Sequence, residues 1–239
     1  MQKTIYFFWY QGIDNAPKVV HICLASWRMH NPDWNLVLLD QMNYHEWTDL
    51  RYDGAITLTL FSDYLRLSLL AKHGGLWVDA TCYCNVPLDK WLPEDCFLFE
   101  NFNIQYTIST WFIYSEPGHP LITTWLNSAN SANSVGINAL QNHYFIFYEV
   151  FDTLCAENEN FRNAWKIIPK INQNDPMMYF DKDKKGSTHI RNDCALQPLT
   201  EESKQLILQK QKYVFKLSHK CPDVVPVGSI LAYLATIVE

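Results

Sequence analysis

Three charged residues within the stretch 62–81 form a pattern that could bind an anionic ligand. Asp63 and Arg66 are three residues apart, so on a helix their side chains would share one face. Asp79 ends the apolar run 76–78, which is typical of a strand that is covered on both faces. Open α/β sheets hold their ligands at the carboxyl ends of such strands. The pattern therefore predicts a site for an anionic, hydroxylated ligand, and a sugar nucleotide fits this description.

The residues between these charges predict the elements that position them. Four leucines and an alanine at 65, 67, 69, 70 and 71 supply the apolar face of a helix over 56–73. Gly74 suits the left-handed position that closes a helix, and Gly75 allows a sharp turn of the backbone. The strand that follows carries Asp79 at its carboxyl end.

Elements of the same kind alternate along the rest of the chain. We expect strands at 4–9, 34–39, 97–100 and 107–114, the last of them antiparallel, and helices at 17–30, 41–50, 120–131, 134–157 and 200–211. A polar loop is expected at 181–186. This order predicts one α/β domain over residues 1–239, with a Rossmann-type sheet in 1–125 and a mainly helical half in 126–239.

Composition narrows the classes of function. Hydrophobic residues make up 48% of the 239 residues, which is ample for a packed core. A net charge of −6, without a basic block, argues against a nucleic-acid partner. Seven cysteines without a C-x-x-C motif predict reduced, mostly buried thiols in a cytoplasmic protein. The first residues are too short an apolar run for a signal peptide, and the apolar run 224–238 predicts a docking helix rather than a membrane-surface anchor.

Three other enzyme classes lack their motifs. The first strand is not followed by the G-x-G-x-x-G of a dinucleotide-binding dehydrogenase, and the G-x-S-x-G of a serine hydrolase is absent. A haloacid-type phosphatase would need a second aspartate two residues after Asp79, where this chain has Thr81.

The chain resembles the capsular polysaccharide synthesis family of bacterial glycosyltransferases and, more distantly, the DXD-containing α-mannosyltransferases. The block 62–81 is the strongest match, and further matches cover most of residues 4–125 in order. They are Ile5-Tyr6-Phe7-Phe8-Trp9-Tyr10-Gln11-Gly12, Ala16-Pro17, Ser26-Trp27, Asn31-Pro32-Asp33-Trp34, Pro87-Leu88-Asp89, Trp111-Phe112-Ile113 and Pro117-Gly118-His119-Pro120-Leu121. Beyond these the likeness is limited to Asn174-Asp175-Pro176 and Lys216-Leu217-Ser218-His219-Lys220.

The resemblance implies a GT-A fold whose Rossmann-like half binds a nucleotide sugar, with a UDP-sugar favoured. Trp9 and Tyr10 would hold the base, although both could equally line the core. Asp63 would contact the ribose or the donor sugar, and Arg66 would orient it or reach a phosphate. Without the resemblance, these two residues could simply pair on a helix face.

The resemblance also implies a divalent metal ion, Mn²⁺ or Mg²⁺. Asp79 would take the first position of the DXD-type motif, near the ribose and the ion. Thr81 stands where many relatives carry the second aspartate, and a hydroxyl is a far weaker ligand than a carboxylate. His219 is a candidate late metal ligand, or otherwise a surface histidine.

On the acceptor side, Trp111 could stack on a sugar or fill the core, and Asp175 lies in a polar loop before Pro176. No catalytic base is assigned, because in a retaining reaction the departing phosphate itself can accept the acceptor's proton.

Together these features predict a cytoplasmic bacterial glycosyltransferase that acts on a surface or capsular glycan. A lipid at the inner membrane could carry the acceptor, with peripheral contact through a partner or the C-terminal helix. The alternative is an inactive carbohydrate- or nucleotide-binding protein of the same fold, for which Thr81 is the main argument.

Overall fold

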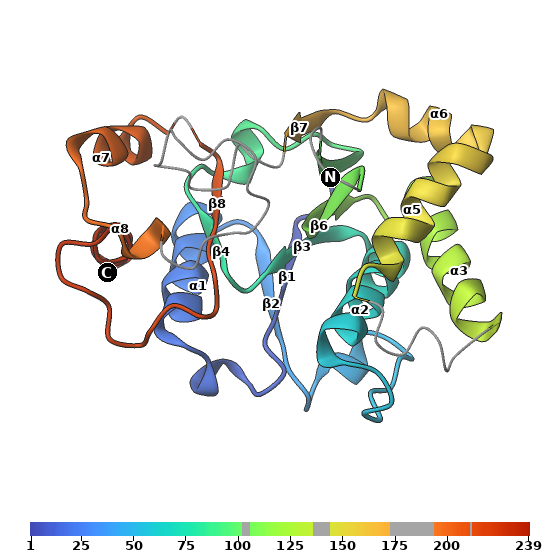
Figure 1. Ribbon diagram of the computed structural model, residues 1–239, viewed down its shortest axis with the longest axis horizontal. Helices are drawn as coiled ribbons and strands as arrows, with labels where there is room; N and C mark the ends of the chain where they lie inside the picture. Colours follow the sequence, from blue (N-terminus) through green and yellow to red (C-terminus); the bar gives the residue numbers. More distant parts are fainter. Residues whose placement is uncertain (102–105, 136–143, 173–193, 211) are drawn as a thin grey trace. The chain divides into compact units, whose positions relative to one another are not determined.

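The computed structural model describes residues 1–101, 106–135, 144–172, 194–210 and 212–239 (Figure 1). Its strands are β1 (Thr4–Phe8), β2 (Asn35–Leu39), β3 (Gly75–Asp79), β4 (Cys82–Cys84), β5 (Cys96–Glu100), β6 (Ile108–Ser115), β7 (Lys170–Asn172) and β8 (Val214–Lys216). Its α-helices are α1 (Lys18–His30), α2 (Leu58–His73), α3 (Pro120–Val135), α5 (Ile146–Glu157), α6 (Glu159–Ile167), α7 (Glu201–Leu208) and α8 (Ile230–Val238). The predicted loop at 181–186 lies outside the described residues.

The expected α/β class is confirmed. One sheet has the strand order β2-β1-β3-β6-β5-β7, and β4 and β8 form a separate two-stranded sheet. β5 pairs antiparallel with β6, as expected for that strand, and parallel with β7. The sheet is therefore mixed, and β3, which ends on Asp79, is an interior strand as the sequence predicted.

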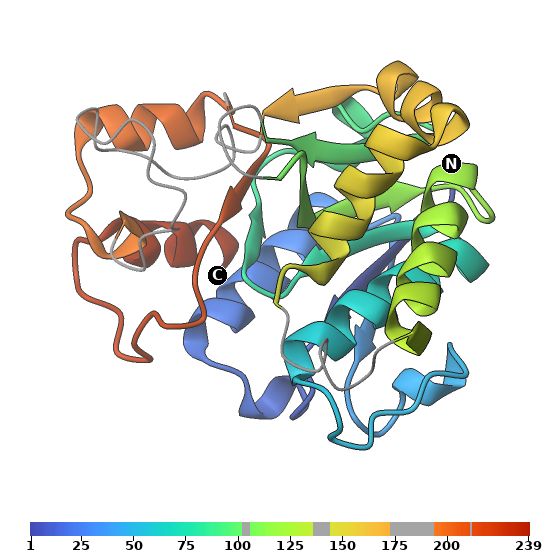
Figure 2. The same cartoon turned by 45° about the vertical axis from the view of Figure 1, so that its right-hand side comes forward.

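By internal contacts the chain divides into two compact units. Unit 1 consists of Met1–Thr4, Gln41–Trp77 and Pro93–Asn172, and unit 2 consists of Ile5–Asp40, Val78–Leu92 and Gln173–Glu239. In unit 1, α3 packs against α2, α5 and α6, and α5 and α6 pack against each other. Figure 2 shows α3, α5 and α6, coloured yellow-green to gold, as a group. In unit 2, α1 packs against β4 and α8.

The helix stop before β3 is formed as predicted. Gly74 has a φ of 65° and closes α2, its N–H donating to the Leu70 carbonyl. A β-carbon added to Gly74 would lie 2.6 Å from the backbone nitrogen of Pro117, closer than real contacts allow. At the other end of α2, the Thr57 hydroxyl accepts a hydrogen bond from the Leu60 N–H, at 3.2 Å, and caps the helix. A local cap therefore fixes the start of α2, and a positive φ together with the close approach of Pro117 fixes its end.

Two predicted helices are wrong in part. The segment 41–50 forms only a 3₁₀ turn, Tyr44–Glu46, because its side chains bond the backbone locally: the Thr48 hydroxyl accepts from the Leu50 N–H and the Tyr44 hydroxyl from the Tyr52 N–H. Of the helix expected over 134–157, residues 134 and 135 belong to α3, Ile146–Glu157 form α5, and residues 136–143 lie outside the described residues.

The C-terminal apolar run docks as predicted. Within it, α8 begins at Ser229, whose hydroxyl accepts from the Ala232 N–H. Its residues Ile230, Leu231 and Leu234 are buried, and α8 packs against α1 in the same unit. Among the residues that the structure describes, no helix is both long and apolar enough to cross a membrane.

Candidate functional site

The charge pair on α2 is buried inside unit 1. Arg66 Nη1 lies 3.1 Å from Asp63 Oδ1, and the two side chains are 5% and 6% exposed. The same Nη1 donates to the Thr110 carbonyl at 2.6 Å, while Nε and Nη2 donate to the backbone and side chain of Ser62. The guanidinium also lies 5.1 Å from the centre of the Trp77 ring. The sequence-predicted pair is therefore real, and Arg66 is held on several sides.

A tyrosine extends this group. The Tyr148 hydroxyl lies 2.9 Å from the hydroxyl of Thr110 on β6. The backbone carbonyl of this same threonine accepts a hydrogen bond from Arg66. Burial, reinforced by the Asp63 charge, raises the pKa of Tyr148 above its ordinary value. The phenol is thus neutral at physiological pH and serves as a hydrogen-bonding group.

Unit 2 contains a second charged group, at the end of β3. Lys216 Nζ lies 3.2 Å from Asp79 Oδ2 and donates to the Thr81 hydroxyl at 2.7 Å. The Asp79 side chain is 30% exposed, whereas that of Lys216 is 10% exposed. The structure thus brings Asp79 and Thr81, both predicted from the sequence, to one ammonium group that was not predicted.

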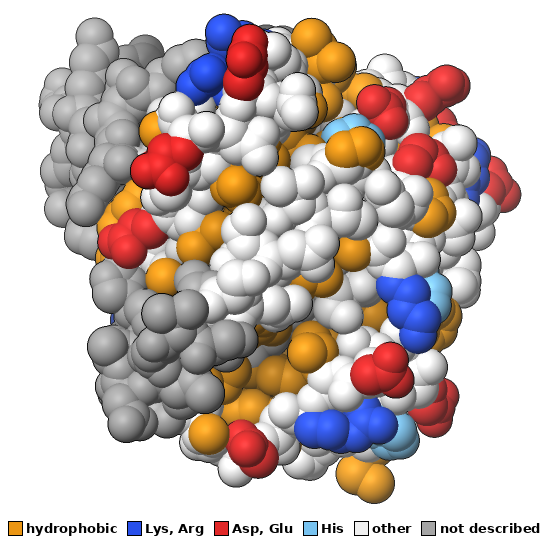
Figure 3. Space-filling model, turned by 90° about the vertical axis from the view of Figure 1, so that its right-hand side faces the viewer, with side chains coloured by type: hydrophobic (Ala, Val, Ile, Leu, Met, Phe, Trp, Pro, Cys, Tyr) orange, Lys and Arg blue, Asp and Glu red, His pale blue; other side chains and the backbone are white. Residues whose placement is uncertain are grey.

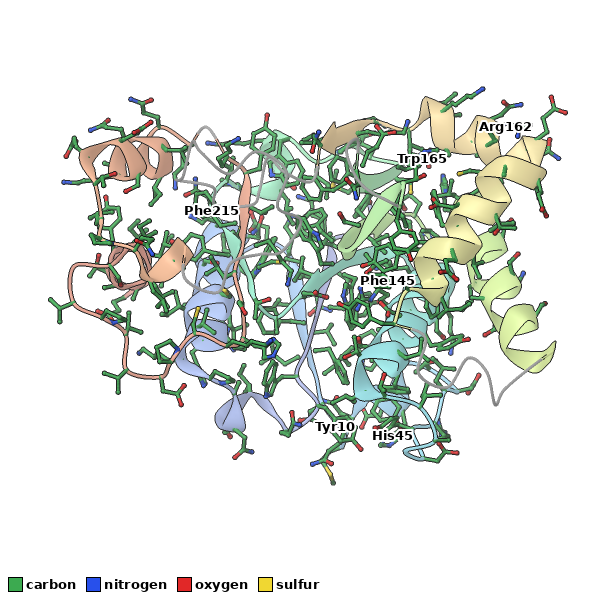
Figure 4. The ribbon with its side chains drawn as sticks, viewed as in Figure 1. Tyr10, His45, Phe145, Arg162, Trp165 and Phe215 are labelled. Carbon is green, nitrogen blue, oxygen red and sulfur yellow. The ribbon has the colours of Figure 1, made fainter. Side chains whose placement is uncertain are left out.

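The β4–β8 pair positions this lysine. Lys216 is the register partner of Cys82, and the Leu217 N–H donates to the Thr81 carbonyl at 2.8 Å. β4 is in turn attached to α1, because the Trp27 indole N–H donates to the Cys82 carbonyl at 2.7 Å. Phe215, labelled in Figure 4, is buried beside Lys216 on β8. The lysine is therefore carried by a rigid part of unit 2.

The lysine is charged at neutral pH. Burial by itself would lower the pKa of the ammonium, but the nearby Asp79 carboxylate and the Cys82 thiol outweigh it, so the pKa lies above the ordinary value. A buried charge is stable only when it is paired and hydrogen-bonded, and here both Asp79 and Thr81 meet that need.

His219 is exposed, and it lies close enough to Lys216 and Asp79 to be affected by their charges. Partial burial, followed by the charges of Lys216 and Lys220, lowers the pKa of the imidazole, and the Asp79 charge opposes this shift. Within the described ranges, no three His, Cys, Asp or Glu side chains gather as a metal-ligand set. The two predicted metal ligands, Asp79 and His219, are too few for a closed ligand set among the described residues. The Lys216 ammonium already contacts the Asp79 carboxylate.

The predicted base-binding residues follow β1. Trp9 and Tyr10 are half-buried, and the Trp9 N–H donates to the Leu39 carbonyl at the end of β2. Tyr10 packs edge-on against Phe8 and, in Figure 4, lies in the loop that follows β1. This loop turns at Gly12, whose N–H donates to the Trp9 carbonyl. Both rings are thus placed after a strand end, with part of their surface accessible.

The acceptor-side residues have different outcomes. Trp111 is 6% exposed and stacks on Phe99, with ring centres 4.7 Å apart, so it packs in the core of unit 1 and has little surface for a sugar. Asp175 lies outside the described residues.

On the face drawn in Figure 3, basic side chains are scattered among acidic and neutral ones.

Sequence reasoning missed Lys216 as a site residue, although a signal exists. It is the only charged residue in the run 213–217, whose other members are hydrophobic. A lone lysine within a buried strand needs a partner, and this requirement points to a carboxylate nearby.

The chain matches a protein-family model and several curated proteins that are named as glycosyltransferases. Residues 1–225 match the family model described as capsular polysaccharide synthesis protein. The O-glycosyltransferase braB of Annulohypoxylon truncatum is 27% identical over 153 residues, covering 52% of this chain and 36% of that protein. The O-glycosyltransferase PaGT of Phomopsis amygdali is 28% identical over 94 residues, covering 33% and 23%. The chain therefore spans little more than a third, or less, of the length of these relatives.

Among solved structures, the PaToxG glycosyltransferase superposes with a TM-score of 0.45 and 15% sequence identity, covering 70% of this chain and 74% of that one.

Proposed function

The chain belongs to the capsular polysaccharide synthesis protein family, and on this premise we propose that it is a glycosyltransferase. It takes a sugar from a nucleotide-sugar donor, with a UDP-sugar favoured, and transfers it to a surface or capsular glycan. The observation that carries the proposal is the Asp79–Lys216–Thr81 group, in which a partly exposed carboxylate, a hydroxyl and a buried ammonium meet at the end of a central strand.

The reaction sets the demands on this site. The bond between the anomeric carbon and the diphosphate oxygen breaks, and its electron pair leaves with the diphosphate. The acceptor hydroxyl oxygen forms the new bond to the anomeric carbon, and its proton passes to the departing phosphate. Positive charge is needed where the diphosphate gains negative charge, and a carboxylate near the sugar suits its oxocarbenium-like character.

Retention of anomeric configuration is part of the proposal, because the DXD-containing transferases that the chain resembles retain it. A proton NMR spectrum of the product tests it through the anomeric coupling. A product with inverted configuration would contradict it.

The implied divalent ion does not fit the described residues. Mg²⁺ and Mn²⁺ prefer carboxylate oxygens. Among the described residues, the site offers the Asp79 carboxylate, a threonine hydroxyl that accepts from Lys216, and an exposed histidine. An ammonium 3.2 Å from Asp79 Oδ2 would repel an ion bound to the same carboxylate.

For the acceptor, we propose a glycan carried on a lipid at the inner membrane. The apolar face of α8 is buried, so the helix itself cannot supply the membrane contact. Val224 and Val227, in the loop before α8, are 85% and 102% exposed and are the better candidates. Flotation with anionic liposomes should recover the chain and should fail for the Val224→Ser/Val227→Ser variant. Equal flotation of both would contradict this contact.

The first experiment is a thermal-shift panel of UDP, GDP and CDP and their sugars. A ligand at 100 times its dissociation constant stabilises a protein by about 2.7 kcal/mol, which is easily measured. A selective shift identifies the base of the donor, and absence of any shift contradicts the proposal. The alternative, an inactive binding protein of the same fold, predicts a shift without release of nucleoside diphosphate when donor and acceptor glycans are supplied.

A further inference from the structure

We propose that the Lys216 ammonium is the cation that binds the donor's diphosphate, so that donor binding and transfer need no divalent metal ion. This inference rests on the proposed function, and it assigns the task of charge neutralisation to a residue of the chain itself.

The first argument is the position of the charge. Lys216 is 9% exposed on a strand whose neighbours Phe215 and Leu217 are buried. Its ammonium reaches Asp79 and Thr81, the two positions of the DXD-type motif, where the resemblance places a divalent ion near the ribose. A cation is thus already present where the leaving group requires one.

The second argument is the number of donors. An ammonium has three N–H groups. Within the described part of the chain, Lys216 contacts two acceptors, Asp79 Oδ2 and Thr81 Oγ1. A phosphate oxygen can take the third N–H while both protein contacts remain. Thr81, which accepts from the ammonium, holds it in place as a carboxylate would, without adding a second negative charge.

The third argument is the balance of charge around the group. Lys216 and Lys220 are both close enough to lower the pKa of His219, whereas Asp79 is the one acid that acts on it. The carboxylate is the more exposed member of the ion pair, at 30% against 10%. More cations than acids therefore act on His219 beside this group, and an anionic ligand can approach the Asp79–Lys216 pair without a metal ion between it and the protein.

In the transfer step, the electron pair of the broken bond stays on the diphosphate oxygen, and Lys216 stabilises it by charge and a hydrogen bond. The ammonium keeps its proton. The proton of the acceptor hydroxyl goes to the phosphate, and the products are the glycosylated acceptor and the protonated nucleoside diphosphate.

The test measures binding of UDP and of uridine by calorimetry, first in EDTA and then with Mn²⁺; GDP and guanosine or CDP and cytidine replace them if the thermal-shift panel selects another base. We expect the wild-type chain to bind the diphosphate in EDTA more tightly than the nucleoside, with little change on adding Mn²⁺. Binding of the diphosphate only with Mn²⁺ would overturn the inference and leave the proposed function intact. Binding of no nucleotide under either condition would overturn both.

The matched variants are Lys216→Met and Lys90→Met. Both remove one ammonium from unit 2, but Lys90 is exposed on the turn after β4. Lys216→Met should weaken diphosphate binding in EDTA by about 10- to 100-fold, the size of a lost hydrogen bond to a charged group, and leave nucleoside binding unchanged. Lys90→Met should change neither. Equal diphosphate binding by wild type and Lys216→Met would overturn the inference.

A second variant protects the test against a folding defect in Lys216→Met. Thr81→Asp/Lys216→Ala restores a second carboxylate and leaves room for an ion. It should bind the diphosphate only with Mn²⁺, which a purely structural role of Lys216 does not predict. Metal-independent binding by this variant would overturn the inference.

Discussion

Two of the ion pairs in the described part of the chain bury their cation, and they differ in how far the carboxylate is exposed. In unit 1, Arg66 and Asp63 are 5% and 6% exposed, and the guanidinium also donates to Ser62 and Thr110. In unit 2, Lys216 is similarly buried, but its partner Asp79 is 30% exposed. Both members of the first pair are almost fully buried, whereas the second pair has a partly exposed carboxylate.

This difference separates a role in stability from a role in binding. A fully buried pair contributes little net stability but is costly to break, because the remaining charge has no water around it. A pair with one accessible member can exchange part of its solvent for a ligand. We therefore expect substitutions in the Asp63–Arg66 pair to act mainly on folding and those in the Asp79–Lys216 pair mainly on the donor.

The largest effect should come from Arg66→Met. It leaves Asp63 charged and buried, so the free energy of unfolding should fall by about 3–5 kcal/mol in urea denaturation. Arg51→Met, at an exposed position in the same unit, is the control and should change it by less than about 0.5 kcal/mol. Similar values for the two variants would show that the buried pair is not a stability element.

Asp79→Asn should have the second-largest effect, and it should appear in turnover. Removing the carboxylate charge should lower the rate of nucleoside diphosphate release by about 100-fold, or about 2.7 kcal/mol in the barrier. The buried Lys216 ammonium loses its counter-charge, but asparagine and Thr81 can still accept from it, so the free energy of unfolding should fall less than in Arg66→Met. Asp33→Asn, exposed in the same unit, is the control. A loss of stability equal to that of Arg66→Met would remove the distinction between the two pairs.

Thr81→Val should have a smaller effect. It removes the hydroxyl that accepts from Lys216 at 2.7 Å but keeps the shape of the side chain. Leaving a buried donor without this acceptor costs about 1–3 kcal/mol, divided between folding and donor affinity. Thr81→Ser, which keeps the hydroxyl, should restore donor affinity measured by calorimetry. Failure of serine to restore it would mean that the methyl group, not the hydroxyl, matters.

Most of the elements that position these groups could be predicted from the sequence. Helix α2, the stop at Gly74 and the strand to Asp79 follow from local rules: apolar spacing, a residue that tolerates a positive φ, and a short apolar run. The Asp63–Arg66 contact also follows, because the two residues are one helical turn apart.

The rest depends on contacts between distant parts of the chain. Lys216 meets Asp79 and Thr81 only because β8 pairs with β4, and a pairing across more than 130 residues has no local signal. Similarly, whether Trp111 fills the core or faces a sugar depends on Phe99, which lies on the neighbouring strand β5. The residue types alone identified Trp111 as a candidate, but only its burial in the structure shows that it fills the core.

The smallest effect at neutral pH should come from His30→Gln, which separates the contribution of His30 to acid sensitivity from that of the Asp79–Lys216 pair in the same unit. Burial, and then the charges of Lys210 and Lys90, lowers the pKa of His30 from 6.5 to about 4. Between these values the unfolded chain binds the proton and the folded chain does not, so stability is complete above pH 6.5 and falls as the pH drops towards 4. The variant lacks this group, so its free energy of unfolding should fall less over that range. His21→Gln, on the same helix α1, is the control, and an identical pH dependence of wild type and His30→Gln would show that acid acts elsewhere in the chain.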